Sequence, residues 1–443
     1  MTVNHVAQIA DAILYEGYNL YPYRAAALKN QQRWLFGVLC PEPYCARQAG
    51  SDDWRMRTEC LVRESVQNVV AVNVRFLHLV DQRVFEVVDQ TTPAAVPTFR
   101  PVASLQVGQD GHYTWQQAVE RSVAVTLRLQ ESAAGQQTFS FPATNETIAL
   151  NNDRDQLVGQ LVRDQQAVQG IVEIAVERCD RETFKVRVTI ENQTRLASDE
   201  CDHREHALLR SLVSTHTILT VEGGEFVSLL DPPDNLRESA EACRNAGTWP
   251  VLVGEPGSRK MMLSSPIILP DYPRIAPESL GDLFDGTEID ELLLLRIQTL
   301  TDKEKREMAG VDERTRQILE RTQTLAPNQV LKLHGTMRPT GEAELSAPPR
   351  HDQRIRVLGV EIRPGSRVRL RPRSRADAFD LVLNGMPATV RSIEVDFEDN
   401  VYVAVTVDDD PGQDLGCQGK PGHRFFFRSD EIEPIGKNEE GNR

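Results

Sequence analysis

The chain has 443 residues, of which 40% are hydrophobic and 26% charged, an ordinary globular composition with room for about three domains. Its 65 acidic and 50 basic residues give a net charge of −15. Because such a charge repels nucleic acid and anionic lipid, the composition excludes a bulk nucleic-acid-binding protein.

The start of the chain and its cysteines indicate the compartment. The N-terminal residues include Asp11 and Glu16 and lack a basic start followed by an apolar run, so they do not resemble a secretory signal. The longest apolar runs, residues 34–40 and 401–405, are too short to span a membrane. The seven cysteines are irregularly spaced, which does not fit a secreted disulfide framework. We therefore expect a cytoplasmic protein.

The first two hundred residues change from a helical to a β pattern. Residues 3–34 are expected to form two helices interrupted by Tyr21 and Pro22. Short runs rich in Val, Ile, Phe and Thr then predict antiparallel strands at residues 56–62, 69–79, 84–88, 123–129, 138–141, 172–176 and 184–190. Residues 156–169 are expected as an inserted helix, and residues 180–182 as a hairpin connection.

The second half of the chain is expected to be β, then helical, then β again. Gly223 and Gly224 predict a hairpin over residues 218–230, and residues 249–253 a further strand. Residues 288–308 carry one apolar helical stripe that Gly310 can end, and residues 311–325 form a second helix. After a proline-rich linker, five short strands are predicted at residues 357–362, 367–370, 388–395, 402–407 and 424–427.

The fold class expected from these patterns is mainly β with helical segments (α+β). It combines an antiparallel sandwich or barrel-like body, a helical hairpin and a small C-terminal SH3-like barrel. The expected parts are a helical aromatic-basic segment (1–54), the β-rich body (55–274), a helical region (275–336), a linker (337–353), the barrel (354–436) and a polar tail (437–443).

An aromatic and basic segment near the N-terminus has the composition of a protein interface. Its members are Tyr15, Tyr18, Tyr21, Tyr23, Arg24, Lys29, Arg33 and Trp34. Tyrosine, tryptophan and arginine are the residues that dominate binding hot spots. Two alternatives remain open. The aromatic side chains could instead pack the segment onto the chain's own β-body, or they could bind single-stranded nucleic acid, which the acidic net charge disfavours.

Two cysteine-containing motifs are candidate chemical sites. Cys201, His203 and His206 form the densest group of potential ligands for zinc, nickel or iron, but a structural site needs about four ligands. The alternative is a solvated polar loop before a helix. Cys40 and Cys45 have a longer spacer than redox motifs and zinc knuckles use, which favours a rigid loop with incidental cysteines.

The sequence contains no nucleophile elbow, phosphate-binding loop, dinucleotide motif or HExxH motif. We therefore expect no enzymatic activity and no cofactor.

The C-terminal part is electrically polarised. Residues 354–375 contain eight arginines and one acid, and residues 376–410 contain nine acids and one arginine. Arg367 and Arg369 lie on one predicted strand and Arg371 directly follows it, and this basic face could bind an acidic partner surface or nucleic acid. Salt bridges between the two runs are the alternative.

Several stretches together resemble a family of bacterial proteins that are encoded beside high-affinity, actinobacterial-type uptake nickel–iron hydrogenases. The similarity covers nearly the whole chain and carries over no catalytic residue. The stretches are residues 13–18 (ILYEGY), 20–24 (LYPYR), 28–34 (LKNQQRW), 54–60 (WRMRTEC), 211–216 (SLVSTH), 226–233 (FVSLLDPP), 248–254 (TWPVLVG), 266–277 (PIILPDYPRIAP) and 424–434 (RFFFRSDEIEP).

The resemblance implies a context, namely maturation, assembly or support of the hydrogenase. We therefore expect a non-catalytic accessory factor that contacts hydrogenase subunits or maturation proteins through the aromatic-basic segment and the C-terminal barrel. The alternatives are a metal-handling maturation protein that uses Cys201, His203 and His206, and a nucleic-acid-binding regulator that uses the arginine-rich strand.

Overall fold

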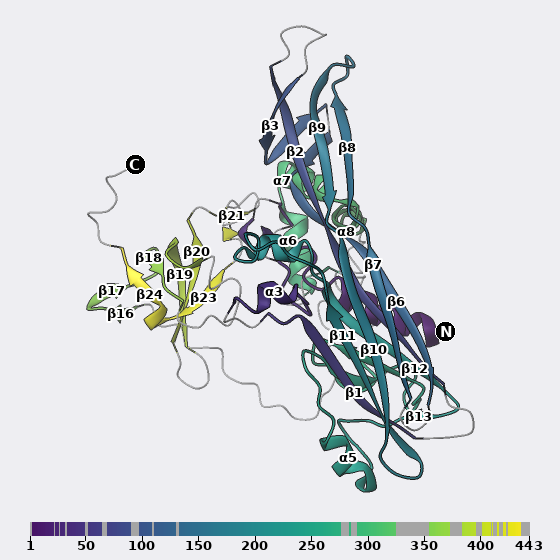
Figure 1. The fold of residues 1–443 in the computed structure, drawn as a ribbon. Helices are drawn as coiled ribbons and strands as arrows, with labels where there is room; N and C mark the ends of the chain where they lie inside the picture. Colours follow the sequence, from purple (N-terminus) through teal and green to yellow (C-terminus); the bar gives the residue numbers. More distant parts are fainter. Residues whose placement is uncertain are drawn as a thin grey trace. The chain divides into compact units, whose positions relative to one another are not determined.

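The computed structural model contains two compact units, Met1–Tyr18 with Trp34–Phe284 and Asn19–Arg33 with Asp285–Arg443 (Figure 1). The described residues are 2–21, 23–25, 27–31, 33–48, 52–63, 69–89, 97–108, 110–129, 133–275, 283–284, 290–324, 354–372, 383–395, 401–408, 410, 414–415, 420–421 and 424–435. The predicted linker at residues 337–353 lies outside them.

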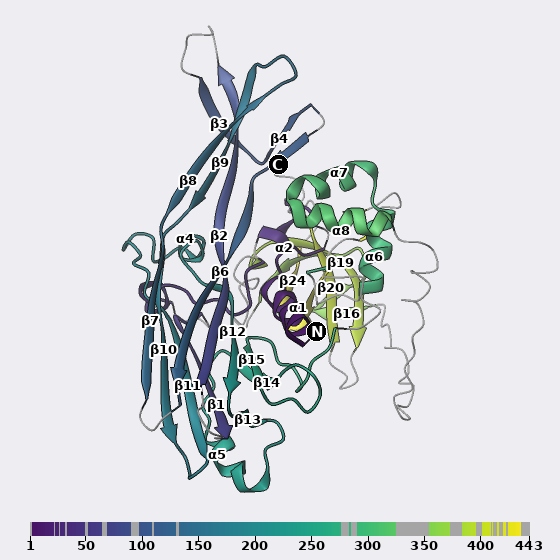
Figure 2. The same cartoon turned by 90° about the vertical axis from the view of Figure 1, so that its right-hand side faces the viewer.

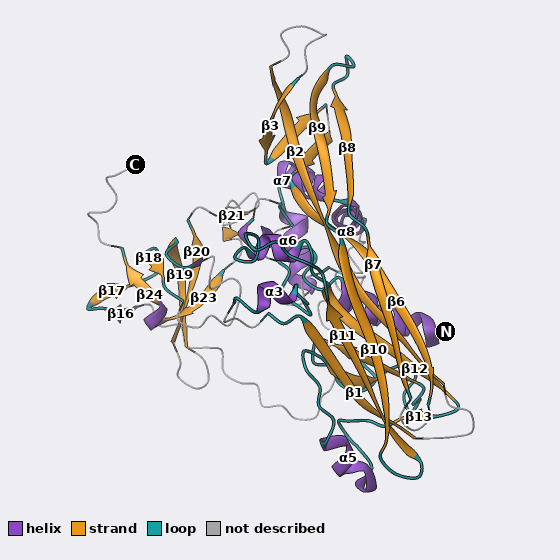
Figure 3. Cartoon of the chain, in the orientation of Figure 1, coloured by secondary structure: helices purple, strands orange, loops and turns teal. Residues whose placement is uncertain are grey.

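The first unit is built mainly from strands (Figure 3). Its helices are α1 (Thr2–Leu14), α3 (Glu42–Cys45), α4 (Arg204–Leu208) and α5 (Arg237–Glu241), and η1 (Asp234–Leu236) is a 3-10 turn. Its strands are β1 (Arg55–Arg63), β2 (Val69–Asp89), β3 (Thr98–Val102), β4 (Ser104–Val107), β5 (Asp110–Tyr113), β6 (Trp115–Arg128), β7 (Ala134–Phe141), β8 (Thr144–Asn151), β9 (Leu157–Gln165), β10 (Val168–Arg178), β11 (Thr183–Asn192), β12 (Val213–Glu222), β13 (Glu225–Phe226), β14 (Trp249–Leu252) and β15 (Met261–Ser265).

Two antiparallel sheets of this unit share one hydrophobic core. The five-stranded sheet has the order β13-β1-β11-β10-β7, and the eight-stranded sheet runs β14-β15-β12-β2-β9-β8, with β3 and β6 also paired to β2. Alternate residues of both sheets are buried together, such as Val186 and Val188 of β11 and Val72 and Val74 of β2. This period-two burial is what strands with one core-facing side require.

Strand β2 is long because it changes partners along its length. Its first part pairs with β12, and residues Asp81 to Glu86 pair with β9. On its other edge, β2 pairs first with β6 and then with β3. Figure 2 shows the β3, β8 and β9 end of this sheet extending past the ends of β7, β10 and β11. Because β12, β9, β6 and β3 together pair with most of its 21 residues, so long a strand stays regular.

Two local predictions for the first unit were wrong. Residues 156–169 form β9 and the start of β10 rather than a helix, because the apolar spacing there suits both periods and β2 supplies a partner edge. Gly159 fits that edge, since a Cβ atom there would overlap the carbonyl oxygen of Phe85. The hairpin expected at residues 218–230 does not form: after Gly223, β13 pairs with β1 of the other sheet.

The second unit contains helices α2 (Leu28–Gln31), α6 (Asp290–Thr299), α7 (Asp302–Val311) and α8 (Glu313–Gln323). The single helix expected over residues 288–308 is divided at Thr301. The Thr301 hydroxyl accepts a hydrogen bond from the Glu304 N–H, and Glu304 Oε2 accepts one from the Thr301 N–H, which is a capping box that starts α7. Gly310 lies inside α7 instead of ending it. Within the described residues, no helix has both the length and the apolar character needed to cross a membrane.

The C-terminal part of the second unit is a five-stranded antiparallel sheet of order β23-β20-β19-β18-β24. Its core contains Val368, Val390, Val405 and Ile432. Residues 357–362, predicted as one strand, turn at Leu358 and Gly359, both with positive φ, so they belong to a two-stranded hairpin. The strands are β16 (Ile355–Val357), β17 (Val360–Ile362), β18 (Arg367–Leu370), β19 (Pro387–Val395), β20 (Val401–Val407), β21 (Asp414–Leu415), β22 (Lys420–Pro421), β23 (Phe425–Arg428) and β24 (Ile432–Pro434), with a 3-10 turn η2 (Ser429–Glu431).

The fold class is therefore confirmed at the level of a mainly β chain with several antiparallel sheets, the helical pair α7–α8 and a C-terminal five-stranded sheet.

Candidate functional site

Asp271 ties together three segments of the first unit that are distant in sequence. Its Oδ2 accepts a hydrogen bond from the Ser228 hydroxyl at 2.5 Å, and its Oδ1 accepts one from the Leu252 N–H at 2.8 Å. The Tyr272 N–H donates to the Leu252 carbonyl oxygen at 2.7 Å, which completes the link to β14. The Ser228 oxygen also accepts from the Asp231 N–H at 2.9 Å. The turn after β13, strand β14 and the segment after β15 are thus held in one arrangement.

Each of the three tied segments exposes at least one large apolar side chain. Leu230 is 61% exposed, Trp249 is 45% exposed and Ile268 is 73% exposed. Exposed apolar residues occur singly on most proteins, but here the three come from segments joined at one carboxylate. We call these residues the Asp271 surface. Figure 2 shows β13, β14 and β15 near one another at the α5 end of this unit.

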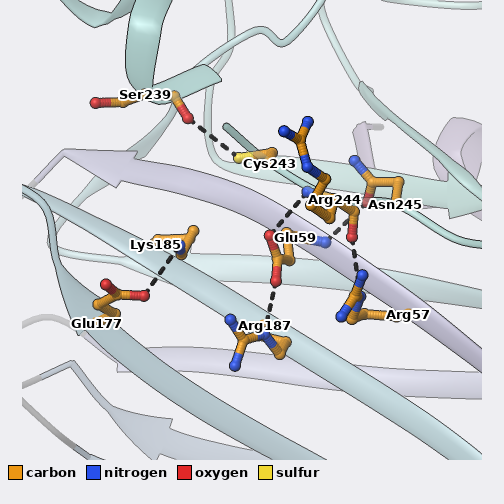
Figure 4. Close-up of polar contacts among 9 residues, drawn as sticks. All are labelled: Arg57, Glu59, Glu177, Lys185, Arg187, Ser239, Cys243, Arg244 and Asn245. Carbon is orange, nitrogen blue, oxygen red and sulfur yellow. Dashed lines mark hydrogen bonds and ion pairs between the residues drawn. The ribbon is translucent and has the colours of Figure 1, made fainter. Parts of the chain in front are cut away.

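A second carboxylate, that of Glu59, holds the segment that leads into Trp249 (Figure 4). Glu59 Oε1 accepts a hydrogen bond from Arg187 Nε at 2.6 Å, and Oε2 accepts one from the Arg244 N–H at 2.8 Å. The Glu59 N–H donates to Asn245 Oδ1 at 2.8 Å. Arg57 Nε donates to the Arg244 carbonyl oxygen at 3.1 Å. The chain from residue 243 to residue 246 is therefore fixed on β1.

Burial of the Glu59 side chain would raise the pKa of its carboxyl, but the Arg244 N–H and Arg187 outweigh this effect and the pKa is lowered. Glu59 is 2% exposed and both of its oxygens accept hydrogen bonds. A carboxylate that is ionised and has both oxygens bonded is poorly placed to take up a proton in catalysis. Its role here is to position the chain.

Apolar packing also attaches the residues between the Asp271 and Glu59 hydrogen-bond networks to β1. Leu61 of β1 packs with Val227, Leu236 and Ala240, and Cys243 lies against the same cluster. The Val227 N–H donates to the Leu61 carbonyl oxygen at 2.9 Å. The segment from residue 227 to residue 246 is thereby attached to β1 at both ends and through Leu61. This attachment limits the movement of the segments that carry the Asp271 surface.

The predicted aromatic-basic segment is divided between the two units. Seven of its eight side chains are buried: Tyr15, Tyr18, Tyr21, Tyr23, Lys29, Arg33 and Trp34. In the first unit, Tyr18 lies edge-on to Trp34 with ring centres 5.7 Å apart, and Trp34 Nε1 donates to Gln116 Oε1 at 2.8 Å.

In the second unit, Arg24 forms a 2.7 Å ion pair with Glu307 of α7. The guanidinium of Arg296 lies over the Tyr21 ring at 5.1 Å. The aromatic side chains therefore pack within the chain's own units, and partner binding through them stays a prediction.

The predicted basic strand of the C-terminal sheet is paired internally. Arg367 Nη2 lies 2.6 Å from Asp408 Oδ2, and Arg371 Nε lies 3.1 Å from Glu433 Oε2. Arg369 Nη1 donates to the Gly385 carbonyl oxygen at 3.0 Å. The Arg367–Asp408 pair links the basic and acidic runs, as in the salt-bridge alternative.

The predicted metal ligands are not gathered into a site. The Cys201 thiol donates to the Ala197 carbonyl oxygen at 3.2 Å, while the His203 and His206 rings lie 5.4 Å apart. His216 is buried in β12 with Nδ1 at 3.0 Å from the Ser214 carbonyl oxygen. In the part of the chain that is described, no three His, Cys, Asp or Glu residues are grouped to hold a metal ion. Metal binding stays a prediction that elemental analysis of purified protein can test.

No family model matches the sequence, and neither does any curated protein. Among solved structures, the chain is similar to the Salmonella SPI-1 type III secretion injectisome secretin InvG (residues 176 to end, open gate state). The identity is 10% and the TM-score 0.09, over 47% of this chain and 56% of the secretin chain. The match thus spans little more than half of the secretin chain. With so low a TM-score, we infer neither fold nor function from it.

Sequence reasoning did not single out Ser228, Trp249, Ile268 and Asp271 as site residues. A serine and an aspartate 43 residues apart form no local motif, and only strand pairing brings them together. One signal was present in the sequence: all four belong to stretches that carry the family resemblance.

Proposed function

We propose that this chain is a cytoplasmic, non-catalytic accessory or assembly factor for a nickel–iron hydrogenase, acting through protein–protein contacts. The observation that carries the proposal is the junction at Asp271. Three of the stretches that resemble the hydrogenase-associated family, residues 226–233, 248–254 and 266–277, are hydrogen-bonded to one another there. Each contributes one member of the Asp271 surface, so the resemblance and the exposed apolar residues coincide.

The construction of the Asp271 surface supports a contact role. Tryptophan is the residue most typical of binding hot spots. Trp249 is exposed, and Leu230 and Ile268 are exposed aliphatic residues on the two segments that are joined to β14 at Asp271. The hydrogen bonds to Asp271 and Glu59 already fix the backbone beneath these side chains. A surface fixed before binding loses less conformational entropy when a partner docks.

We also infer the finer architecture. The shared core of the two sheets in the first unit supports a β-sandwich. In the C-terminal part, the strand order β23-β20-β19-β18-β24 and the 3-10 turn between β23 and β24 support a small SH3-like barrel. Arg367, Arg369 and Arg371 remain the proposed contact residues of that barrel.

The test is association with purified hydrogenase subunits and maturation proteins, measured by co-purification and by titration. The variant combines Leu230→Ser, Trp249→Ala and Ile268→Ser. We expect its affinity for the partner to fall by roughly a hundredfold, because truncating a central aromatic and its neighbours removes hot-spot contacts. Its melting temperature should change little, since all three side chains are exposed.

The matched control combines Val88→Ser and Val119→Ser. These two side chains are also apolar and exposed, at 56% and 40%, but lie on β2 and β6. The control should bind as the unsubstituted chain does. If the chain associates with no hydrogenase component, the proposed function is wrong. If it associates but the triple variant binds equally well, the function stands and the Asp271 surface is not the interface.

A further inference from the structure

Cys40 is held firmly where two backbone segments meet. Leu39 forms backbone bridges to Leu212 and to Asp53. The Cys40 N–H donates to the Asp53 carbonyl oxygen at 2.9 Å, and Asn192 Nδ2 donates to the Leu39 carbonyl oxygen at 2.8 Å. Cys40 is fully buried. Its sulfur therefore has little freedom to move away from its neighbours.

The next five residues bring a second sulfur back to the first. Pro41 precedes α3, and the Cys45 N–H donates to the Pro41 carbonyl oxygen at 3.3 Å, which closes one helical turn. Cys45 packs against the apolar cluster that contains Cys40, Tyr44 and Ala207. The loop in which the sequence predicts incidental cysteines thus gathers both thiols at one apolar cluster.

The two thiols differ in access to solvent. Cys45 is partly exposed at the end of α3, whereas Cys40 lies behind it at 0% exposure. A reagent in solution can therefore reach Cys45 first, and Cys40 in the same cluster is a thiol that can displace it.

We propose that Cys40 and Cys45 are a reversible redox modification site, closed to an intramolecular disulfide by exchange with a small-molecule disulfide. The Cys45 thiolate attacks one sulfur of that disulfide, forms a mixed disulfide and releases one thiol. Cys40 then loses its proton and attacks the Cys45 sulfur, which forms the Cys40–Cys45 bond and releases the second thiol. Two electrons pass from the protein to the reagent, which ends as two thiols.

The surroundings of Cys45 make this closure slow at neutral pH. The neighbouring Cys40, burial, and the nearby carboxylates of Asp52 and Asp53 all raise the pKa of the Cys45 thiol above its ordinary value. Because the thiolate is the attacking species, the rate of closure should rise with pH. Arg204 also lies close, paired with Asp52 at 3.2 Å, and so offsets part of that negative charge.

The experiment uses the full chain and oxidised glutathione at about pH 7 and about pH 9. After acid quenching and denaturation, free thiols are alkylated with N-ethylmaleimide and the chain is digested with trypsin. Residues 34–47 form a single tryptic peptide that contains both cysteines. We expect this peptide to lose both alkylation sites and to weigh two hydrogen atoms less than the reduced peptide, sooner at the higher pH. Reduction should restore both sites.

Two variants separate closure from simple surface oxidation. In Cys40→Ser, Cys45 should retain glutathione, because no second thiol can displace it. In Cys45→Ser, Cys40 should remain unmodified in the folded chain. The exposed Cys179 is an internal control that can carry glutathione in every sample. The proposal is overturned if the peptide from the unsubstituted chain keeps glutathione on Cys45 beside an alkylated Cys40, or if both cysteines remain alkylated at both pH values.

Discussion

Glu59 and Arg187 face each other on the paired strands β1 and β11, and Arg187 Nε donates to Glu59 Oε1 at 2.6 Å. The pair is unequal in exposure, since the Glu59 side chain is 2% exposed and that of Arg187 is 41% exposed. Water can therefore solvate the guanidinium but not the carboxylate. The buried charge depends on its protein partners, which include the Arg244 N–H at the start of the path to Trp249.

Replacing Glu59 by Gln should destabilise the first unit by roughly 2–4 kcal/mol, because breaking a buried charged network leaves donors without an acceptor. One oxygen becomes an NH₂ group, which cannot accept from either Arg187 or the Arg244 N–H. Urea unfolding measures the loss. The control is Glu177→Gln, since Glu177 pairs with Lys185 at 2.9 Å but is 65% exposed, and it should cost less than about 1 kcal/mol. Equal losses in the two variants would contradict the positioning role of Glu59.

Removing the Asp271 carboxylate should loosen the surface that bears Trp249. In Asp271→Ala, the Leu252 N–H and the Ser228 hydroxyl lose their acceptor, at a cost of about 1–3 kcal/mol. Asp271→Asn keeps one carbonyl oxygen and should cost less. Hydrogen exchange of the Leu252 amide is the direct measurement, and it should be faster in the alanine variant. If that amide stays protected to the same extent, Asp271 is not what holds β14.

We expect the protein to lose stability in mild acid, because two buried histidines resist protonation in the folded chain. Burial lowers the pKa of His78 and of His216 to about 4, and the nearby Arg121 and Arg75 respectively act in the same direction. Hydrogen bonds from the imidazole rings to the Gln166 and Ser214 carbonyl oxygens, and for His216 the charge of Asp11, offset this only in part. Between the ordinary pKa of about 6.5 and this lowered value, the unfolded chain binds more protons than the folded chain.

The contribution of the two neutral histidines to the free energy of unfolding should therefore be fully present above about pH 6.5. The free energy of unfolding should fall by roughly 3 kcal/mol as the pH is lowered from there to about 5. The measurement is the free energy of unfolding as a function of pH in that range. His78→Gln and His216→Gln should each remove about half of the slope, whatever they do to stability at neutral pH. The exposed His203 provides the control, since His203→Gln should leave the slope as it was. A slope that survives both substitutions would assign the acid sensitivity to other groups.

Elements that were predictable from the sequence are those whose signals are local. Residues 172–176 and 184–190, with a turn at 180–182, are confirmed as the hairpin of β10 and β11, because alternation and turn residues lie next to one another in the chain. The division of the helix at Thr301 was also readable, since threonine followed three residues later by Glu304 is a capping box. It was missed because the apolar stripe continues across it.

The candidate site was not predictable in this way, because its bonds join residues that no local pattern connects. Ser228, Leu252 and Asp271 meet only after β12, β14 and β15 have paired. The aromatic-basic segment shows a different limit of prediction from sequence, because its pattern is local but has two interpretations. Composition cannot distinguish an exposed interface from a packed core when tyrosine and tryptophan serve both, and burial is what separates the two uses.

Trp34 and Trp249 should respond to truncation in opposite ways. Trp34 is 2% exposed and donates to Gln116, whereas Trp249 is 45% exposed on the edge strand β14. Trp34→Ala should destabilise the chain by about 3–5 kcal/mol, because it leaves a large cavity and removes the hydrogen bond from Trp34 Nε1 to Gln116. Trp249→Ala should cost less than about 1 kcal/mol and weaken partner binding. Chemical unfolding and hydrogenase-subunit titration, run on both variants, check this. Little loss of stability in Trp34→Ala, together with weakened binding, would return the aromatic-basic segment to the interface.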